Sequence, residues 1–499
     1  RSMIREIEQL IASGMLDQFD RYFVKTLQRL APTAGPQTLV LAALARKAVS
    51  NGHVCLDLDR LVESSLPPGG GGPGRGGNSD EQGSLQGHPP PSPLPSREGE
   101  SMPSLAELTA ELQQSPLVSR DGNLAPLVLE GHRLYLQRYW RYEEDLVQAI
   151  RARAAHPVAV QEELLASCLS QLFTGMEQDA QQRQACAGIF RESLGLITGG
   201  PGTGKTTLVA KYLALVLLYA QESGEPAPRI LLLAPTGKAA ARLTESLQKK
   251  TAEPVQGLFA SMPTKAATIH RALGCRPESP TTFRHNRENP LPAEVVVVDE
   301  ASMIDVALMA KLFAAVPPTA RLVLPGDKDQ LASVEAGSIL GDICAAVMDG
   351  GREGNNPLAR CVVRLTESFR FSPHEGIGAL ACAIHAGKAD EAVSLAQLGS
   401  AGVSLLPPLV HSDPSHPLAE LILAGYRSFL EAAGPFAALT LFEQFRLLCA
   451  HRTGPMGVQA LNRYAEKVLS LHGLIEPIGP NGPWYKGRPV LIQANSYPL

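Results

Sequence analysis

The sequence predicts an α/β fold in which a parallel β-sheet is flanked by helices, and three stretches of the chain support this prediction. The stretch from Leu194 to Thr207 joins a short apolar strand to a glycine-rich loop and a helix. Residues 229–243 repeat the strand–turn–helix layout without the glycines. Residues 294–303 contain a run of four valines that ends in two carboxylates, which is typical of a strand buried inside a parallel sheet.

The glycine-rich loop, Gly-Gly-Pro-Gly-Thr-Gly-Lys-Thr, fits the phosphate-binding pattern G-x-x-x-x-G-K-[ST]. Its glycines let several backbone N–H groups point at one phosphate, and the following helix adds partial positive charge. We expect Lys205 to reach the β- and γ-phosphates of ATP, and Thr206 to ligate Mg²⁺. Gln182, one helix earlier, can pair its amide with the adenine edge. The other expected nucleotide-binding residues are Gly199, Gly200, Pro201, Gly202, Thr203, Gly204 and Thr207. The plain alternative is a glycine-rich turn that binds nothing.

Later residues complete the expected catalytic set. Asp299 and Glu300 follow the valine strand, where an aspartate of a P-loop enzyme holds Mg²⁺ and a neighbouring glutamate can deprotonate the attacking water. Gln330, after another predicted strand, can contact the γ-phosphate, and Arg370 can stabilise charge on the transferring phosphoryl group. The carboxylate pair favours a hydrolase over a nucleotide kinase, because only a hydrolase needs a base for water.

The chain divides into five segments. Residues 1–66 are expected to be a small helical N-terminal domain, with helices at 3–15, 19–30 and 37–49. Residues 67–104 are a Pro/Gly-rich insertion whose composition predicts disorder. Residues 105–157 complete the N-terminal domain and connect it onward, through a hairpin at 126–136 and a long helix at 137–154. The remaining segments are 158–358, which holds the motifs above, and 359–499.

Two details of these segments are also predicted. Tyr139, Trp140 and Tyr142 on the long helix could stack on bases, but at helical spacing we expect them to be core. In 359–499 we expect strands at 445–450 and from 487 to 495, and a helix at 457–469.

Composition sets weaker bounds. Net charge is −4 with pI near 6.3, which does not indicate a basic nucleic-acid-binding domain but leaves room for a narrow basic groove. The eight cysteines form no C-x-x-C pair, which favours buried reduced thiols in a cytoplasmic protein over a zinc or redox site. No run of 18 apolar residues occurs, so no membrane span is expected.

Further motifs follow the phosphate loop in order: Ala-Pro-Thr-Gly-Lys-Ala-Ala-Ala-Arg at 234–242, Thr-Ile-His-Arg at 268–271, Val-Asp-Glu-Ala-Ser-Met at 298–303 and Glu-Ser-Phe-Arg at 367–370. As an ordered set they resemble the motifs of superfamily 1 helicases. The particular residues within each motif resemble those of the RecD family, the alpha subunits of exodeoxyribonuclease V (RecBCD). The resemblance covers most of the chain apart from the insertion. It implies that 158–358 is a first RecA-like ATPase domain and 359–499 a second, incomplete one.

The resemblance also implies a function. RecD-type subunits are ATP-driven 5′→3′ DNA helicases that act with RecB and RecC, as a heterotrimer, on single-stranded and double-stranded DNA in double-strand-break repair and recombination. By this analogy Lys205, Thr206, Asp299, Glu300, Gln330 and Arg370 form the ATP site, and the N-terminal domain docks partners. The residues that would face DNA are Pro235, Thr236, Lys238, Thr268 and His270.

One departure from the family pattern shapes a further expectation. Superfamily 1 helicases carry two more motifs near the C-terminus of the second RecA-like domain, and neither is present in this sequence. We therefore expect a C-terminally truncated chain that binds Mg·ATP weakly and does not unwind DNA by itself. The alternative function is a non-motor subunit whose P-loop domain is a scaffold within such a complex.

Overall fold

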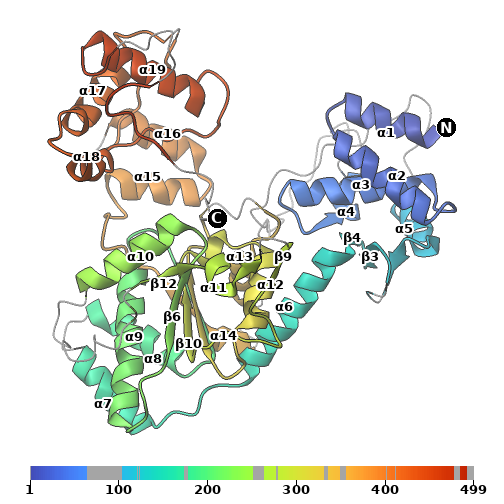
Figure 1. The fold of residues 1–499 in the computed structure, drawn as a ribbon, viewed down its shortest axis with the longest axis horizontal. Helices are drawn as coiled ribbons and strands as arrows, with labels where there is room; N and C mark the ends of the chain where they lie inside the picture. The colour runs from blue at the N-terminus through green and yellow to red at the C-terminus, as the bar shows by residue number, and fades with distance from the viewer. Residues whose placement is uncertain are drawn as a thin grey trace, which may run out of the picture. The chain divides into compact units, whose positions relative to one another are not determined.

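The computed structural model describes residues 2–63, 104–120, 122, 124–173, 178–250, 263, 265–276, 279–330, 335–348, 356–399, 402–410, 412–476 and 484–491. They belong to two compact units, residues 1–371 and 372–499 (Figure 1). The insertion predicted at 67–104 lies outside the described residues, apart from Ser104.

The N-terminal domain packs helices against a small sheet. Its helices are α1 (Ser2–Ala12), α2 (Gln18–Leu30), α3 (Pro36–Ser50), α4 (Leu58–Glu63) and α5 (Leu105–Gln114). Its sheet has the order β1-β4-β3-β2, with β1 at Cys55–Asp57, β2 at Val118–Ser119, β3 at Leu127–Glu130 and β4 at Arg133–Leu136. The predicted hairpin is confirmed as β3 and β4. The expected helices of 1–66 are present, but strand β1 was not predicted; it pairs with β4 and joins the chain before the insertion to the chain after it.

Helix α6 (Gln137–Ala155) leads out of this domain and confirms the interpretation of Tyr139 and Tyr142 as core, whereas Trp140 belongs to none of the hydrophobic cores of the described residues. Tyr139 and Tyr142 are partly buried against the hydrophobic core of the next domain. The Trp140 indole N–H donates to a Glu130 carboxylate oxygen at 3.3 Å. These side chains have protein partners and are not arranged as a free stacking surface.

The centre of the molecule is a six-stranded parallel sheet with the order β12-β5-β11-β10-β6-β7. Its strands are β5 (Leu194–Gly199), β6 (Ile230–Ala234), β7 (Ala267–Thr268), β10 (Val295–Val298), β11 (Arg321–Gly326) and β12 (Val362–Leu365). Two hydrophobic cores lie on its two faces. The valine run shows why, since Val296 and Val298 enter one core while Val295 and Val297 enter the other.

Helices cover both faces of this sheet (Figure 1). The side chains of α7 (Glu162–Leu172), α8 (Gln178–Phe190), α9 (Lys205–Glu222) and α10 (Gly237–Lys250) contribute to one core. Those of α6, α11 (Ile269–Leu273), α12 (Val306–Ala315) and α13 (Ile339–Met348) contribute to the other. Shorter elements are β8 (Cys275–Arg276), β9 (Ser279–Phe283), η2 (Ala301–Met303) and α14 (Pro357–Cys361).

The first domain extends further than the expected boundary at residue 358. Strand β12 begins after that point and pairs in parallel with β5, and the compact unit ends at Phe371. Because β5 lies between β11 and β12, the loop after β5 opens at a position where neighbouring connections diverge, which is where open α/β sheets bind ligands.

In the described part of the second unit, the regular secondary structure is helical, and irregular segments join the helices. Its helices are α15 (Gly376–His385), α16 (Ala389–Leu398), α17 (Pro417–Leu430), α18 (Pro435–Phe442) and α19 (Val458–Leu471), the last of which confirms the helix predicted at 457–469. The strand predicted at 445–450 is wrong, because Phe445 packs its ring 5.1 Å from that of Tyr426 in an aromatic cluster instead of joining a sheet. Residues 487–491 are not a strand either, and 492–495 lie outside the described residues. The RecA-like character of this unit stays a prediction.

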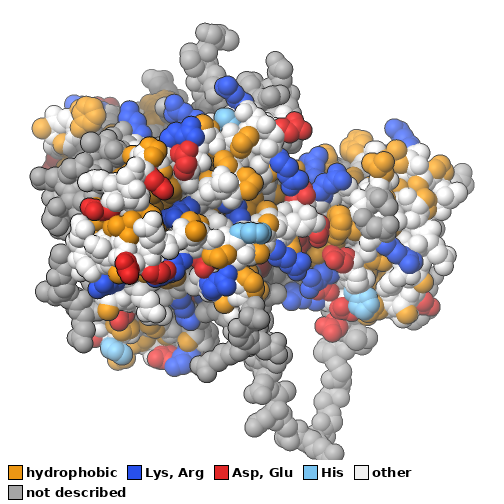
Figure 2. Space-filling model, turned by 90° about the horizontal axis from the view of Figure 1, so that it is seen from below, with side chains coloured by type: hydrophobic (Ala, Val, Ile, Leu, Met, Phe, Trp, Pro, Cys, Tyr) orange, Lys and Arg blue, Asp and Glu red, His pale blue; other side chains and the backbone are white. Residues whose placement is uncertain are grey.

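The surface in Figure 2 is mixed in character, and the cysteines form no disulfide. On the face shown in Figure 2, Lys and Arg side chains lie among acidic and hydrophobic ones, so its charge is mixed. Within the described ranges, no helix is both long and apolar enough to span a bilayer. All eight cysteines are free; Cys168, Cys186, Cys344 and Cys361 are buried as expected, whereas Cys275 and Cys382 are exposed.

Candidate functional site

The loop after β5 has the geometry of a phosphate cradle. Gly202 and Gly204 have φ values of +80° and +83°, a region that favours glycine, and Gly204 is the residue that precedes the first turn of α9. The Lys205 ammonium donates to the carbonyl oxygens of Gly199 at 2.5 Å and Gly200 at 3.0 Å. The lysine thus folds back over its own loop, and several backbone N–H groups converge at the start of the helix.

A pocket of about 710 Å³ opens over this loop and brings most of the predicted ATP-site residues together. It is lined by Gln182, Pro201, Gly202, Thr203, Gly204, Lys205, Thr206, Thr207, Lys211, Ser246, Glu300, Gln330, Phe369 and Arg370. Gly199 and Gly200 do not line the pocket, but their carbonyl oxygens accept hydrogen bonds from the Lys205 ammonium. Gln182 is buried, and its amide nitrogen would lie 2.9 Å from a Cβ added to Gly204, so this side chain packs on the loop.

Several charged side chains act on the Lys205 ammonium. Burial lowers the pKa of Lys205, and the nearby Arg370 lowers it further, while Asp327, Glu300 and Asp299 oppose this change. Burial raises the pKa of Asp299 to about 6; the hydrogen bond from the Glu300 N–H opposes this rise, the Glu300 carboxylate charge adds to it, and the Lys205 ammonium opposes it. A buried carboxyl beside an ammonium and a second carboxyl is an arrangement that a divalent cation would stabilise.

Glu300 has an uncommon backbone conformation. Its φ is +53°, which is left-handed and is rare for a residue with a side chain. Its N–H donates to the Asp299 carboxylate at 3.0 Å, which links the two acids at the end of β10. Such strain persists where the surrounding structure holds it, and it concentrates at functional sites.

The segment after β12 lies directly on the phosphate loop and so positions Arg370. The Phe369 N–H donates to the Gly202 carbonyl at 2.9 Å, and the Ser368 hydroxyl donates to the Pro201 carbonyl at 3.4 Å. The approach is so close that a Cβ added to Gly202 would lie 2.5 Å from the Arg370 Cβ. The predicted arginine therefore shares a pocket with Lys205.

Four site residues were not predicted from the sequence. Asp327 is 1% exposed, and its carboxylate accepts from the Gln330 amide at 3.1 Å and from the Asp329 N–H at 3.2 Å, so it holds the loop that carries Gln330. Its position at the end of an apolar strand was the available signal. Phe369 lies beside the predicted arginine. Lys211 and Ser246 come from within α9 and α10, and no local pattern marks them.

The residues predicted to face DNA lie at the same edge of the sheet but outside this pocket. Parallel pairing of Ala234 with Thr268 brings the ends of β6 and β7 side by side, so residues 235–238 and 268–270 emerge next to each other. Thr236, Lys238 and His270 are exposed, and Pro235 and Thr268 are half-buried. The Thr268 hydroxyl accepts from the Arg271 N–H at 3.3 Å and caps α11. The cluster is a second polar surface beside the pocket.

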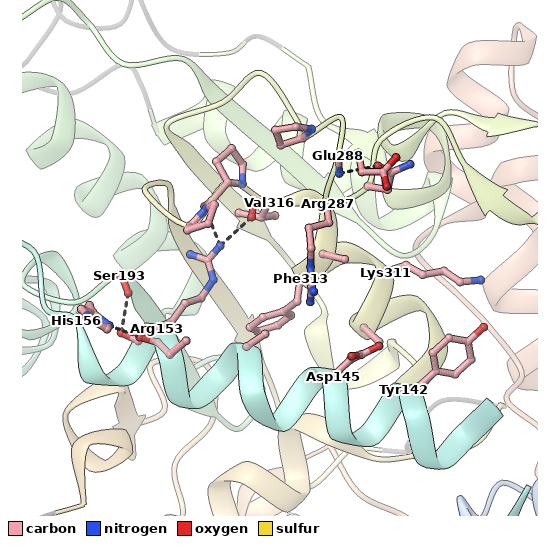
Figure 3. Close-up of a pocket in the computed structure, with 18 residues that line it drawn as sticks. Tyr142, Asp145, Arg153, His156, Ser193, Arg287, Glu288, Lys311, Phe313 and Val316 are labelled. Atoms are coloured by element: carbon pink, nitrogen blue, oxygen red, sulfur yellow. Dashed lines mark hydrogen bonds between the residues drawn. The ribbon is translucent and has the colours of Figure 1, made fainter. Parts of the chain in front are cut away.

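A further pocket, of about 810 Å³, lies between α6, α12 and residues 286–290 (Figure 3). Arg153 extends from α6 to the turn after α12 and donates to the carbonyls of Val316 at 3.0 Å, Pro317 at 2.9 Å and Ala320 at 2.7 Å. Ser193, which also lines it, precedes β5, so this pocket lies at the edge of the sheet opposite the phosphate loop. It contains none of the predicted site residues. Among the residues with described positions, no group of three or more His, Cys, Asp or Glu could hold a metal ion.

Known proteins resemble this chain along its length. The family model described as the N-terminal domain of the RecBCD enzyme subunit RecD matches residues 12–135, and an AAA domain model matches residues 182–336. The chain is 37% identical to the RecBCD enzyme subunit RecD of Mycolicibacterium smegmatis, over 97% of this chain and 78% of that protein. It is 30% identical to the same subunit of Haemophilus influenzae, over 99% and 83% of the two chains. It is 38% identical to the ATP-dependent RecD2 DNA helicase of Deinococcus radiodurans, over 41% and 25% of the two chains. With identity of this extent over nearly the whole sequence, the chain belongs to the RecD family of RecBCD enzyme subunits.

Proposed function

We propose that this chain is the ATP-dependent DNA helicase subunit of a RecBCD-type enzyme. It moves 5′→3′ along single-stranded DNA in the cytoplasm, together with RecB- and RecC-type subunits, in double-strand-break repair and recombination. One observation carries the proposal: Lys205, Glu300, Gln330 and Arg370 line one pocket over a glycine-rich loop. A motor needs such a set, because it must bind the nucleotide, activate water and respond to hydrolysis.

The pocket fits Mg·ATP. Its volume is within the range of small-molecule sites, and the loop supplies N–H donors and an ammonium for phosphate. Thr206 and Asp299 supply the oxygen ligands that Mg²⁺ prefers. The cation would also favour the ionised form of Asp299, whose pKa burial otherwise raises to about 6. Mg²⁺ held by Thr206 and Asp299 would supply positive charge that neutralises the negative charge of the phosphates.

The protein side chains then have distinct roles. Lys205 exchanges the Gly199 and Gly200 carbonyls for phosphate oxygens. Glu300, held at φ +53°, accepts a proton from the attacking water. Gln330, oriented by the buried Asp327, contacts the γ-phosphate or that water. Arg370, which the contacts of Ser368 and Phe369 hold against the phosphate loop, stabilises the transferring phosphoryl group.

The proposed DNA contacts are Pro235, Thr236, Lys238, Thr268 and His270, which emerge together at the ends of β6 and β7. Helix α10 begins within the first of these segments, so it carries Lys238, and it also contributes Ser246 to the proposed ATP pocket. One helix therefore touches both surfaces, which offers a route by which DNA can influence hydrolysis. Substituting Lys238 or His270 with alanine should raise the DNA concentration needed for half-maximal stimulation of ATP hydrolysis.

The deciding experiment is DNA-stimulated ATP hydrolysis and unwinding by the complex reconstituted with RecB- and RecC-type subunits. Lys205→Ala should lower the ATPase rate of this subunit by about 100-fold or more, because the ammonium acts on the charge of the reacting phosphates. Lys388→Ala, in the second unit, is the matched control and should leave the rate unchanged. The scaffold alternative predicts that Lys205→Ala loses nothing.

The direction of movement is tested separately, with the motor of the RecB-type subunit inactivated by substitution. A duplex with a 5′ single-stranded tail should then be unwound, and one with a 3′ tail should not. Preference for the 3′ tail would reverse the proposed polarity while leaving the ATP site intact.

A further inference from the structure

Helix α2 of the N-terminal domain has an exposed aromatic stripe beside its buried face. Phe19 and Tyr22 are each 65% exposed and Leu30 is 67% exposed, whereas Asp20, Val24 and Leu27 are buried. With the intervening Thr26, positions 19, 22, 26 and 30 follow helical spacing and form a single line. At 1.5 Å per residue the stripe is about 16 Å long, which matches roughly three turns of a partner helix.

The stripe is held rigidly. The Asp17 side chain accepts from the N–H groups of Phe19 and Asp20 and caps the helix, and the Asp20 carboxylate reaches back to the Asp17 N–H at 2.7 Å. Arg46 of α3 donates to Asp17 at 3.0 Å and to the fully buried Asp20 at 2.6 Å. These contacts fix α2 on α3, so little conformational entropy would be lost if the stripe were covered.

The aromatic rings are also held in place by cations. The Arg46 guanidinium lies 4.7 Å from the centre of the Phe19 ring, and the Lys25 ammonium lies 5.9 Å from that of Tyr22. Rigid aromatic side chains of this kind supply large contact areas at low entropic cost, which is why they dominate the energetics of protein interfaces.

The charges beside the stripe have one sign. Lys25 and Arg29 are exposed on this side of α2, and the single acid of the helix, Asp20, is buried. The nearby acids are already paired: Glu8 lies 2.8 Å from Arg21, and Asp17 contacts Arg46 and Lys47. An apolar line flanked by unneutralised cations complements an amphipathic helix whose flanks carry Asp or Glu. A second copy of this chain would place like charges together, which disfavours self-association.

We propose that this face of α2, here called the α2 stripe, is where an acidic amphipathic helix from another subunit of the complex docks. The inference rests on the proposed function only for the identity of the complex. The N-terminal domain has a hydrophobic core of its own, and no residue of α2 lines the ATP pocket, so docking and hydrolysis can be tested independently.

The experiment measures the dissociation constant of this chain for the RecB- and RecC-type subunits of the same genome. The double variant Phe19→Ser/Tyr22→Ser should raise it about tenfold or more. Lys25→Glu/Arg29→Glu should raise it similarly and reverse its salt dependence, because attraction becomes repulsion. Leu124→Ser, at a fully exposed apolar residue of the same domain, is the control and should have no effect.

Two further variants keep the result interpretable. Phe19→Leu/Tyr22→Leu retains apolar surface and should keep most of the affinity, which separates loss of docking from loss of folding. Lys205→Ala should assemble with the wild-type constant while losing ATP hydrolysis; if it hydrolyses ATP normally, the proposed function fails and the docking result stands. Unchanged affinity of both α2 double variants would overturn the proposal. So would a wild-type homodimer that the Phe19→Ser/Tyr22→Ser variant dissociates, since that assigns the stripe to a second copy.

Discussion

The closeness of Gly202 to Arg370 can be tested with a single methyl group. Gly202→Ala places a Cβ 2.5 Å from the Arg370 Cβ and 3.1 Å from the Ser368 hydroxyl, and it does so at φ +80°. The backbone conformation alone costs alanine about 1–2 kcal/mol. The clash is with the stem of Arg370 and not with its flexible end, so the segment after β12 must move away from the loop.

The matched control is Gly131→Ala, in the turn of the N-terminal hairpin. Gly131 has φ +57°, and a methyl group there would meet nothing within 4 Å. Gly131→Ala should therefore lose about 1–2 kcal/mol of stability, which corresponds to a melting temperature lower by roughly 2–8 °C, and Gly202→Ala should lose at least as much, because its methyl group also clashes. Only Gly202→Ala should lose ATP hydrolysis, by about tenfold to a thousandfold, because a displaced arginine no longer stabilises the transferring phosphoryl group.

The assay is steady-state ATP hydrolysis with saturating single-stranded DNA, paired with thermal unfolding of each variant. If the methyl group acts through Arg370, adding Arg370→Ala to Gly202→Ala should cause little further loss, since both changes remove the same interaction. Wild-type hydrolysis by Gly202→Ala would refute the reasoning. Equal loss in Gly131→Ala would show that general destabilisation, and not the geometry of the loop, controls the rate.

Two further predictions concern buried charges. Arg153→Met should destabilise the first domain by about 3 kcal/mol or more in urea unfolding, since it leaves the buried carbonyls of Val316 and Ala320 without their side-chain donor and the Pro317 carbonyl with only the Ala320 N–H. Exposed Arg151→Met on the same helix should change stability by less than about 0.5 kcal/mol. For Asp299, the pKa lies at about 6 in the folded protein against an ordinary 3.8, so the folded state binds the proton more tightly. The free energy of unfolding should fall as pH rises from about 4 to about 6, by roughly 3 kcal/mol in total. Asp299→Asn should remove this pH dependence, raise the melting temperature at pH 8 and abolish hydrolysis; an unchanged pH profile would contradict the assigned burial.

The residues of the proposed ATP site could be predicted because their pattern lies in short stretches of the sequence. A glycine loop between an apolar strand and a helix can satisfy its backbone in few ways, and four consecutive valines suit only a strand that is covered on both faces. The order of the motifs then places their ends at one edge of the sheet. Gln330 and Arg370 followed from the same rule, since each comes shortly after a strand of that sheet.

Other features depend on contacts that no short window contains. Strand β1 pairs with β4, whose residues lie about 80 positions away in the sequence. Because a short window around Cys55 does not contain that partner, only helices were predicted in 1–66. Lys211 and Ser246 reach the pocket only because two helices pack on the same face. The apolar run at 445–450 is compatible with either a strand or a packed loop. It is a packed loop because the Phe445 ring contacts the ring of Tyr426, which lies on another element.

Three features of this site lower the stability of the folded protein in the absence of nucleotide. Asp299 keeps a carboxyl where burial opposes its charge, Glu300 holds a backbone angle that most side chains avoid, and burial lowers the pKa of the Lys205 ammonium. Each departure makes the nucleotide-free state less stable, and Mg·ATP would relieve the two electrostatic ones, at Asp299 and Lys205, by supplying opposite charges. Nucleotide should therefore stabilise this domain more than its contact area alone suggests, and it should do so more strongly in the wild type than in Asp299→Asn. If Mg·ATP raised both melting temperatures equally, the buried carboxyl would have no part in binding the cation.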